Sequence, residues 1–243
     1  MNPLHFILII FLIILIYITL RYILSKSSKL TGLINAKTST MIDSKDLETN
    51  IQGSNASNFA YSIWFYINDW NYRYGENKVI FGRTESYSSN NSTINACPAV
   101  ILGNTCNDIV VSLSHYNGTN TNENISSHKC TISDIPLQKW VNLTMSVYNN
   151  TIDIYIDGKL SKTCLMPGVA AINPNANVFV TPGGGFDGWT SKLQYYTHAL
   201  NPQDVWNNYI KGYTNNWFGN LFGSYNLKVS VTENGNPQGS ISI

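Results

Sequence analysis

Charged residues are scarce in this chain, making up 12% of its 243 residues with a formal net charge of +1. No block of lysine and arginine interrupts the sequence, and a near-neutral chain attracts phosphate backbones only weakly. The composition therefore argues against a nucleic-acid partner. The four histidines are scattered, and no two have the His-x-x-x-His spacing of a zinc site. They are His5, His115, His128 and His198.

Motifs for nucleophilic and phosphate chemistry are also missing. The chain has no Gly-x-Ser-x-Gly elbow, and the glycine-rich stretch "TPGGGFDG" lacks the Lys-Ser/Thr pair and following helix of a phosphate loop. We interpret that stretch as a loop leading into a strand. No cofactor is predicted.

Cysteine is limited to four residues with no Cys-x-x-Cys pair, which argues against a zinc site. Four cysteines allow three pairings. We favour Cys97 with Cys106, which bracket "PAVILGNT", and Cys130 with Cys164, which bracket a predicted strand pair around Trp140. Free buried thiols are the alternative.

One long apolar run is present at residues 4–24, "LHFILIIFLIILIYITLRYIL". About 20 helical residues span the roughly 30 Å hydrocarbon core of a bilayer. A cleaved signal peptide would need a basic start and a small-residue cleavage site, and "MNPLH" and "RYILSKSSK" provide neither. We predict that residues 1–24 form an uncleaved membrane anchor with the lipid bilayer as partner.

Flanking charges give the orientation. Lysine and arginine follow the span at Arg21, Lys26, Lys29 and Lys37 and none precedes it, so the positive-inside rule places the C-terminal part on the cytosolic side. The cysteines and several glycosylation sequons argue the other way. The sequons begin at Asn55, Asn90, Asn91, Asn117, Asn124, Asn142 and Asn149. Residues 25–58 are polar and are predicted to form a tether, with a short amphipathic piece around "STMIDSKDLETNI".

From Phe59 onward the sequence predicts an antiparallel β-sandwich, because period-two patterns recur at short spacing with turn residues between them. The inward faces are predicted to be Tyr61, Ile63, Phe65 and Ile67 in one strand, and Val141, Leu143, Met145 and Val147 in another, with Asn142, Thr144 and Ser146 outward. The predicted strands are "YSIWFYI", "NKVIFGR", "DIVVSLS", "WVNLTMSVY", "TIDIYID", "NVFVT" and "SKLQYYT".

One helix is expected in "NPQDVWNNYIKGY", with Asn201 as N-cap, Pro202 at the first position and Gly212 as terminator. Its apolar stripe consists of Val205, Trp206, Tyr209 and Ile210.

The hairpin "TIDIYIDGKL" carries two acids on one strand face, Asp153 and Asp157. Retaining glycosidases place two carboxylates about 5 Å apart. Here Tyr155 stands between the two acids, neither acid is Glu, and Asp157 precedes Gly158 at a turn. We favour a structural role over catalysis, so the protein is predicted not to be an enzyme.

The order of four segments resembles the laminin-G-like, concanavalin A-like jelly roll over residues 59–212. They are "FAYSIWFYI", "NKVIFGR", "LQKWVNLTMSVYNNTIDIYIDGKLSKT" and "FDGWTSKLQYYTHALNPQDVWNNYIKG". The positions that match the family pattern are Trp140, Tyr155, Asp157, Gly158, Phe186, Gly188, Tyr196, Ala199 and Leu200. The resemblance implies an all-β jelly-roll sandwich, preceded here by one transmembrane helix and followed by one short helix.

Such domains often bind calcium or sugars at the sandwich rim. The resemblance makes Asp69, Asp108 and Asp187 calcium candidates, since calcium requires several converging oxygens. The candidate binding residues are Trp70, Tyr72, Tyr74, Asp187 and Trp189. The alternative for these aromatic side chains is that they cover the edge of the core.

The anchor, the Asn-rich loops, "GGGFDGWTSKLQYY" and "WFGNLFGSY" resemble membrane proteins of large nucleocytoplasmic DNA viruses. That resemblance implies a non-catalytic component of the virion inner membrane, with its domain facing capsid proteins. It also implies a viral thiol oxidase that would supply disulfides on the cytosolic side. A lectin for attachment and a degenerate glycoside hydrolase are the alternatives. Residues 213–243 are predicted to add a strand to a sheet edge.

Overall fold

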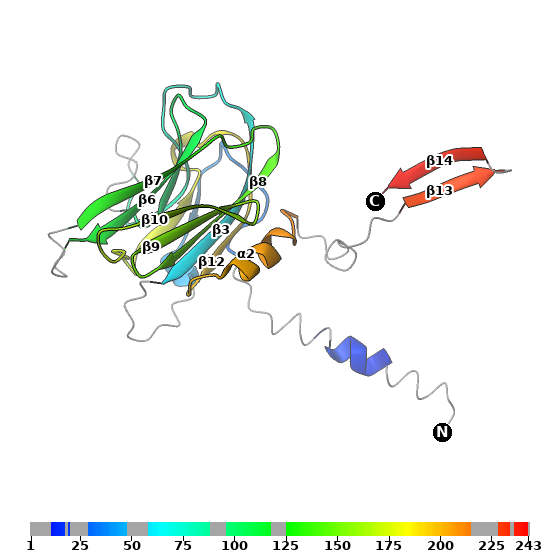
Figure 1. Ribbon diagram of the computed structural model, residues 1–243, viewed down its shortest axis with the longest axis horizontal. Coiled ribbons are helices and arrows are strands. Elements are labelled where there is room, and N and C mark those ends of the chain that lie inside the picture. The colour runs from blue at the N-terminus through cyan, green and yellow to red at the C-terminus, as the bar shows by residue number, and fades with distance from the viewer. Residues whose placement is uncertain are drawn as a thin grey trace.

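The computed structural model describes residues 11–17, 19, 29–47, 58–87, 96–117, 125–214, 228–233 and 236–242. Two six-stranded antiparallel sheets pack face to face in it as a sandwich (Figure 1). The predicted all-β two-layer architecture is therefore confirmed.

Sheet A has the strand order β1-β12-β3-β8-β9-β10, and sheet B has the order β2-β11-β4-β5-β6-β7. The strands of sheet A are β1 (Ile34–Asn35), β12 (Asp187–Tyr196), β3 (Phe59–Asp69), β8 (Trp140–Tyr148), β9 (Thr151–Ile156) and β10 (Lys159–Leu165). Those of sheet B are β2 (Thr40–Ile42), β11 (Asn177–Val180), β4 (Lys78–Thr84), β5 (Ala99–Leu102), β6 (Asp108–Tyr116) and β7 (Ile125–Ser133). The remaining elements are η1 (Ser44–Asp46), η2 (Pro182–Gly184), α2 (Pro202–Tyr209), β13 (Lys228–Glu233) and β14 (Asn236–Ser242).

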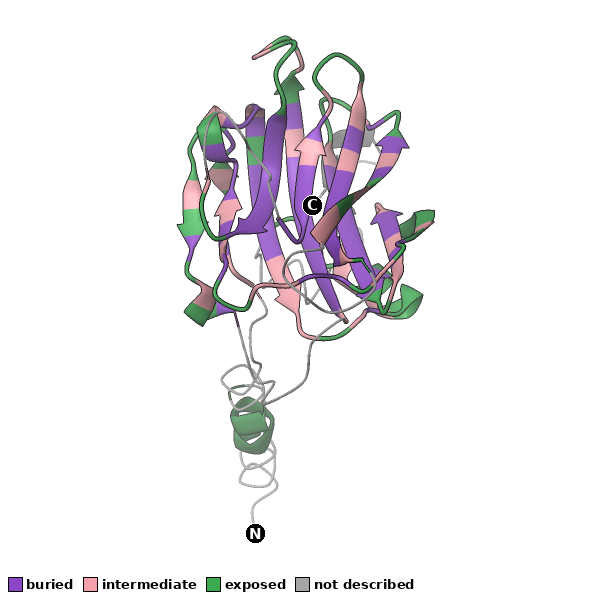
Figure 2. Cartoon of the chain, turned by 90° about the vertical axis from the view of Figure 1, so that its left-hand side faces the viewer, coloured by how far each residue is buried: buried purple, intermediate pink, exposed green. Residues whose placement is uncertain are grey.

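The core lies between the sheets and is formed by alternate residues of each strand, which run as buried bands along the sandwich in Figure 2. Every residue of the two predicted inward faces is at most 1% exposed. These residues are Tyr61, Ile63, Phe65, Ile67, Val141, Leu143, Met145 and Val147. Both predictions are confirmed.

The outer face of sheet A is covered in part, which differs from the sequence prediction. Asn142, Thr144 and Ser146 point away from the core but are at most 4% exposed. Their side chains are hydrogen-bonded to other parts of the fold. Thr144 Oγ1 lies 2.9 Å from Ser62 Oγ, and Ser146 Oγ donates to Leu200 O at 3.1 Å. These side chains are thus buried in a polar layer, and the sequon at Asn142 is inaccessible in the folded domain.

Helix α2 lies over this face. Asn201 Oδ1 accepts from Asp204 N at 2.8 Å, which confirms the predicted N-cap. The predicted apolar stripe is only half correct. Val205 is fully buried and the Tyr209 ring stacks on Trp64 at 5.5 Å, whereas Trp206 and Ile210 are 41% and 60% exposed. Ile210 is largely exposed to solvent, whereas one edge of the Trp206 ring lies against Gly158 at the β9–β10 turn.

The predicted tether of residues 25–58 is wrong over much of its length. Residues 34–35 form β1 at the edge of sheet A and residues 40–42 form β2 at the edge of sheet B. Ala36 and Leu47 are completely buried in the core. The sandwich therefore begins at about Lys29, whose backbone already bridges to Gln194.

Most of the predicted anchor at residues 4–24 lies outside the described residues. Residues 11–17 within it are helical, and their apolar side chains are exposed. In the part of the chain that the structure describes, no helix is both long enough and apolar enough to cross a membrane.

The cysteines confirm one predicted pair and contradict the other. A disulfide joins Cys130 of β7 to Cys164 of β10 and so links sheet B to sheet A. Cys97 and Cys106 are free thiols. Cys97 is buried with Sγ 3.6 Å from Ser114 O, whereas Cys106 is exposed in the loop before β6, so the two side chains are in different environments.

The C-terminal extension also differs from its prediction. Where one strand was expected to join a sheet edge, β13 and β14 pair with each other as a separate two-stranded sheet.

The strands of sheet A end at two opposite ends of the sandwich. We call the end where β3 stops at Asp69 and β12 starts at Asp187 the rim. We call the opposite end, where β8 stops at Tyr148 and β10 stops at Leu165, the base.

Candidate functional site at the rim of the sandwich

The two acids of the β9–β10 hairpin each have a structural partner. Asp153 Oδ1 accepts from Thr163 Oγ1 at 2.6 Å across the hairpin. Asp157 Oδ1 accepts from Asn142 N at 2.9 Å, and its other oxygen lies 3.4 Å from Lys139 Nζ. Each carboxylate therefore has a partner within the fold, as a structural role requires.

Tyr155, between the two acids, is 2% exposed and packs with Leu200 and Val205 beneath helix α2. The position where a sugar ring would have to lie between Asp153 and Asp157 is therefore filled by protein. This arrangement leaves the two acids without a shared substrate site.

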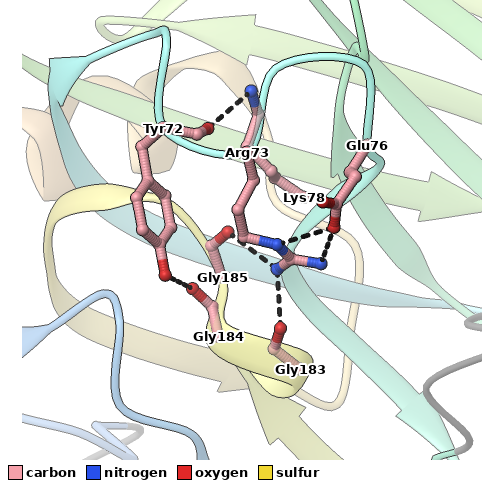
Figure 3. Close-up of polar contacts among 7 residues, drawn as sticks. All are labelled: Tyr72, Arg73, Glu76, Lys78, Gly183, Gly184 and Gly185. Carbon is pink, nitrogen blue, oxygen red and sulfur yellow. Dashed lines mark hydrogen bonds and ion pairs between the residues drawn. The ribbon is translucent and has the colours of Figure 1, made fainter.

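The rim is built by two loops that are pinned together by Arg73 (Figure 3). The Arg73 guanidinium donates to Gly183 O at 2.6 Å and to Gly185 O at 3.3 Å. Its Nε donates to Glu76 Oε2 at 2.9 Å. These bonds fix the 70–77 loop onto the glycine-rich 182–185 turn, which explains the role of "TPGGGFDG".

Trp70 and Tyr72, both predicted to bind a ligand, mainly hold this loop in place. Tyr72 Oη donates to Gly184 O at 3.2 Å. The almost fully buried Lys78 donates to the carbonyls of Trp70 and Tyr72 at 3.3 Å, and its Nζ lies 4.5 Å from the centre of the Trp70 ring. Burial lowers the pKa of Lys78 because the ammonium is partly desolvated. Both aromatic rings therefore have internal partners.

Tyr74 and Asp187 remain at the surface. Tyr74 is 58% exposed at the tip of the 70–77 loop. Asp187 accepts from Asn68 Nδ2 at 2.7 Å and lies 2.6 Å from Lys37 Nζ. The bond from Lys37, followed by that from Asn68, lowers the pKa of Asp187, while the same contact raises the pKa of Lys37. A carboxylate, an ammonium and an amide thus lie together beside β12.

Four aromatic side chains cross the outer face of sheet A next to this polar group, and we call them the aromatic row. Trp189 of β12 is the direct cross-strand partner of Tyr66, which is in turn the partner of Trp140. The Tyr66 and Trp140 ring centres are 5.8 Å apart, and Tyr213 stacks on Trp140 at 4.3 Å. Trp189 and Tyr213 are 43% and 36% exposed.

Of the five predicted binding residues, only Trp189 belongs to the row, with Asp187 beside it. The outward position of Tyr66 could have been predicted from the sequence, because Tyr66 alternates with the inward Phe65 and Ile67. The contact of Tyr213 with Trp140 could not be predicted from the sequence, because it depends on the path of the folded chain after α2.

The three calcium candidates do not form a site. Asp69 and Asp187 are paired across β3 and β12, but Asp69 Oδ1 accepts from Asn71 N at 2.9 Å and Asp187 is held by Lys37. Asp108 lies on β6 of the other sheet. Among the described side chains, no three acidic, histidine or cysteine residues are grouped to hold a metal ion.

This surface offers non-covalent chemistry. Flat rings can stack on sugar or protein groups, and the neighbouring carboxylate and ammonium can accept and donate hydrogen bonds. Exposed aromatic side chains beside a few polar groups are typical of recognition surfaces.

Comparison with protein families agrees with this fold. The sequence model of the concanavalin A-like lectin/glucanases superfamily (laminin G type) matches residues 40–206. The chain belongs to this superfamily. The matched region starts at β2, before the boundary predicted from the sequence, which agrees with the position of β2 in sheet B. No curated protein matches the sequence.

Solved structures of low identity share the sandwich. One is a mutant of HCR/D, with 14% identity and a TM-score of 0.55, covering 73% of this chain and 42% of that one. Another is the botulinum neurotoxin serotype D ligand-binding domain in complex with N-acetylneuraminic acid, with 13% identity, a TM-score of 0.53 and coverage of 73% and 42%. The receptor-binding domain of a botulinum neurotoxin C/D mosaic serotype has 16% identity, a TM-score of 0.53 and coverage of 73% and 41%. Because this superfamily member spans about two fifths of those chains, the likeness shows the fold alone.

Proposed function

We propose that this protein is a non-catalytic binding protein, anchored in a membrane by residues 4–24, that presents the rim of its sandwich to a partner. The proposal depends mainly on the contrast between the carboxylates of the β9–β10 hairpin and the aromatic side chains of the rim. The acids that could do chemistry, Asp153 and Asp157, are held in structural bonds, whereas Trp189 and Tyr213 of the aromatic row are partly exposed. The fold neighbours named as ligand- and receptor-binding domains support the same kind of role.

The finer proposal is a component of a virion inner membrane whose domain faces the capsid. It is supported by the resemblance of "GGGFDGWTSKLQYY" and "WFGNLFGSY" to viral membrane proteins and by the positive residues that follow the apolar run. Protease treatment of sealed membranes carrying the full chain tests this orientation. In sealed vesicles whose cytosolic face is outside, the protease should digest the sandwich. Protection of the sandwich from the protease would contradict the proposed orientation.

A glycan-binding role is the second candidate, because the aromatic row lies beside a carboxylate and an ammonium. The full chain in lipid nanodiscs, applied to a glycan array, separates the candidates. A saturable sugar ligand favours the lectin, binding of capsid protein without a sugar ligand favours the virion component, and cleavage of a bound sugar would overturn a non-catalytic role.

A matched pair of variants tests the site itself. Trp189 and Trp206 are 43% and 41% exposed, but only Trp189 belongs to the aromatic row. We expect Trp189→Ala to weaken binding of the identified partner at least about tenfold, as for a central aromatic contact, and Trp206→Ala to leave binding unchanged. The reverse pattern would move the site to helix α2.

A further inference from the structure

Exposed apolar side chains gather at the base of the sandwich, the end opposite the rim. Tyr148, Leu165 and Val169 are 61%, 67% and 44% exposed, and we call them the base cluster. Tyr148 and Leu165 flank the same residue, Thr151, in neighbouring strands. Val169 follows in the segment that crosses to sheet B, where its carbonyl accepts from Tyr116 N at 3.0 Å.

The chain enters sheet A from this same end. β12 runs from Asp187 at the rim to Tyr196 near the base. Lys29 forms a β-bridge with Gln194, which is close to the base end of β12. Leu30 N then donates to Leu193 O at 2.7 Å, so the chain proceeds from there toward the rim. Lys29, the first described residue of the sandwich, therefore lies nearer the base than the residues that follow it.

The length of chain between the predicted span and Lys29 limits how far the base can stand from a bilayer. The span ends at Leu24, and five residue steps reach at most about 17 Å when fully extended. Gln194 lies level with Ser62 and Thr144, and Tyr148 is four residues further toward the base, or ~13 Å along the strand. The difference of about 4 Å keeps the base of the sandwich close to the lipid headgroups.

We propose that the base cluster lies in the interfacial layer of the bilayer that holds the anchor, so that the rim and its aromatic row point away from the membrane. This inference rests on the anchor of the proposed function. Tyrosine is favoured at the level of the headgroups, and leucine and valine gain from leaving water there. The base cluster thus contacts a lipid surface. A partner that binds the rim approaches from the side of the sandwich that faces away from the membrane.

Labels at the two ends of the full chain in phosphatidylcholine–phosphatidylglycerol vesicles test the inference. Cys106 supplies the rim position without mutation, because it is exposed in the loop whose Asn104 O accepts from Gly75 N at 2.9 Å. Tyr148→Cys in a Cys106→Ser background supplies the base position, and Val169→Cys in that background supplies a second one if the first fails to fold. Buried Cys97 is expected to remain unlabelled in all of them.

We expect an environment-sensitive fluorophore at position 148 or 169 to be shifted to the blue and quenched several-fold more by nitroxide headgroup lipids than the same fluorophore at Cys106. Equal, weak quenching at both ends would overturn the inference, as would equal, strong quenching, which would show that the sandwich lies on its side. Flotation and alkaline extraction of the same vesicles separate the two proposals. Loss of the protein from the vesicles refutes the anchor, whereas retained protein with an unquenched base refutes only the orientation.

Discussion

Thr144 lies in a small polar group between sheet A and the segment around helix α2. Its hydroxyl is 2.9 Å from Ser62 Oγ and 3.1 Å from Asn142 Oδ1, and all three residues are at most 1% exposed. A buried polar atom that loses its partner keeps its full desolvation penalty. The group therefore stabilises the fold only while it is complete.

We predict that Thr144→Val lowers the free energy of unfolding by about 1–3 kcal/mol, because the isosteric change leaves two buried polar groups with one partner fewer. Urea denaturation measures the change. Thr163→Val is the matched control, since its hydroxyl bonds to Asp153 at the surface, and it should change the free energy by less than about 1 kcal/mol. Equal effects of both substitutions would contradict the argument.

The buried thiol of Cys97 predicts a pH effect. Burial raises its pKa from 9.0 to about 12, so the folded state keeps a proton that the unfolded state has released. The stabilising contribution is complete below pH 9 and is lost as the pH rises toward 12. Each group of this kind changes the free energy of unfolding by about 1.4 kcal/mol per pH unit within its window.

The comparison of wild type with Cys97→Ala isolates this contribution. Burial lowers the pKa values of Lys78 and Lys192, and these groups act in the opposite direction, but they are common to both proteins and cancel in the difference. We expect the stability advantage of wild type over Cys97→Ala in chemical denaturation to shrink between pH 9 and pH 10.5. A pH-independent difference would show that Cys97 ionises equally in both states.

At the scale of elements, the Cys130–Cys164 disulfide joins edge strands β7 and β10 of opposite sheets. It closes a loop of 34 residues, for which chain entropy gives about 4 kcal/mol of stabilisation. We predict that the double variant Cys130→Ala/Cys164→Ala loses about 3–4 kcal/mol in urea denaturation. Dithiothreitol should lower wild-type stability by a similar amount and leave the double variant unaffected. A stabilising effect of dithiothreitol on either protein would contradict this.

Elements whose cause is local could be predicted from the sequence. The β8–β9 hairpin follows from strict alternation around Asn149-Asn150, and the start of α2 follows from Asn201 and Pro202. Strands β5 and β7 were missed, because β5 is an apolar run of only four residues without alternation and β7 is an edge strand with many polar or exposed side chains. β1 and β2 contain two and three residues, and only their distant partners make them strands.

The candidate site was less predictable for the same reason. The sequence supplies aromatic residues but not their partners, so Trp70 and Tyr72 looked available until the structure placed Lys78 and the glycine turn against them. Trp189, predicted from the sequence to bind a ligand, is 43% exposed, and its binding role stays a prediction. The rest of the aromatic row requires the register of three strands, which single-sequence patterns do not fix.

At the scale of the whole molecule, the sandwich extends further toward the N-terminus than its β-pattern suggests. We predict that a fragment starting at residue 29 folds, whereas one starting at residue 58 is less stable by about 3–6 kcal/mol, because Ile42 and Leu47 leave the core. Removing β1 and β2 also uncovers the edges of β12 and β11, which favours aggregation. Circular dichroism and urea denaturation of the two fragments, both ending at residue 214, check this. Equal midpoints would contradict it.

The pairing of the entering segment with β12 also determines how the module bears a load. Leu30 and Ala36 donate backbone bonds to Leu193 and Gly188, and such bonds in an antiparallel pair lie across the strand direction. A force on the chain before Lys29, directed away from the rim, acts along the strand. It therefore shears these hydrogen bonds together instead of breaking them one after another. The mechanically strong direction of the sandwich is therefore along its first strand.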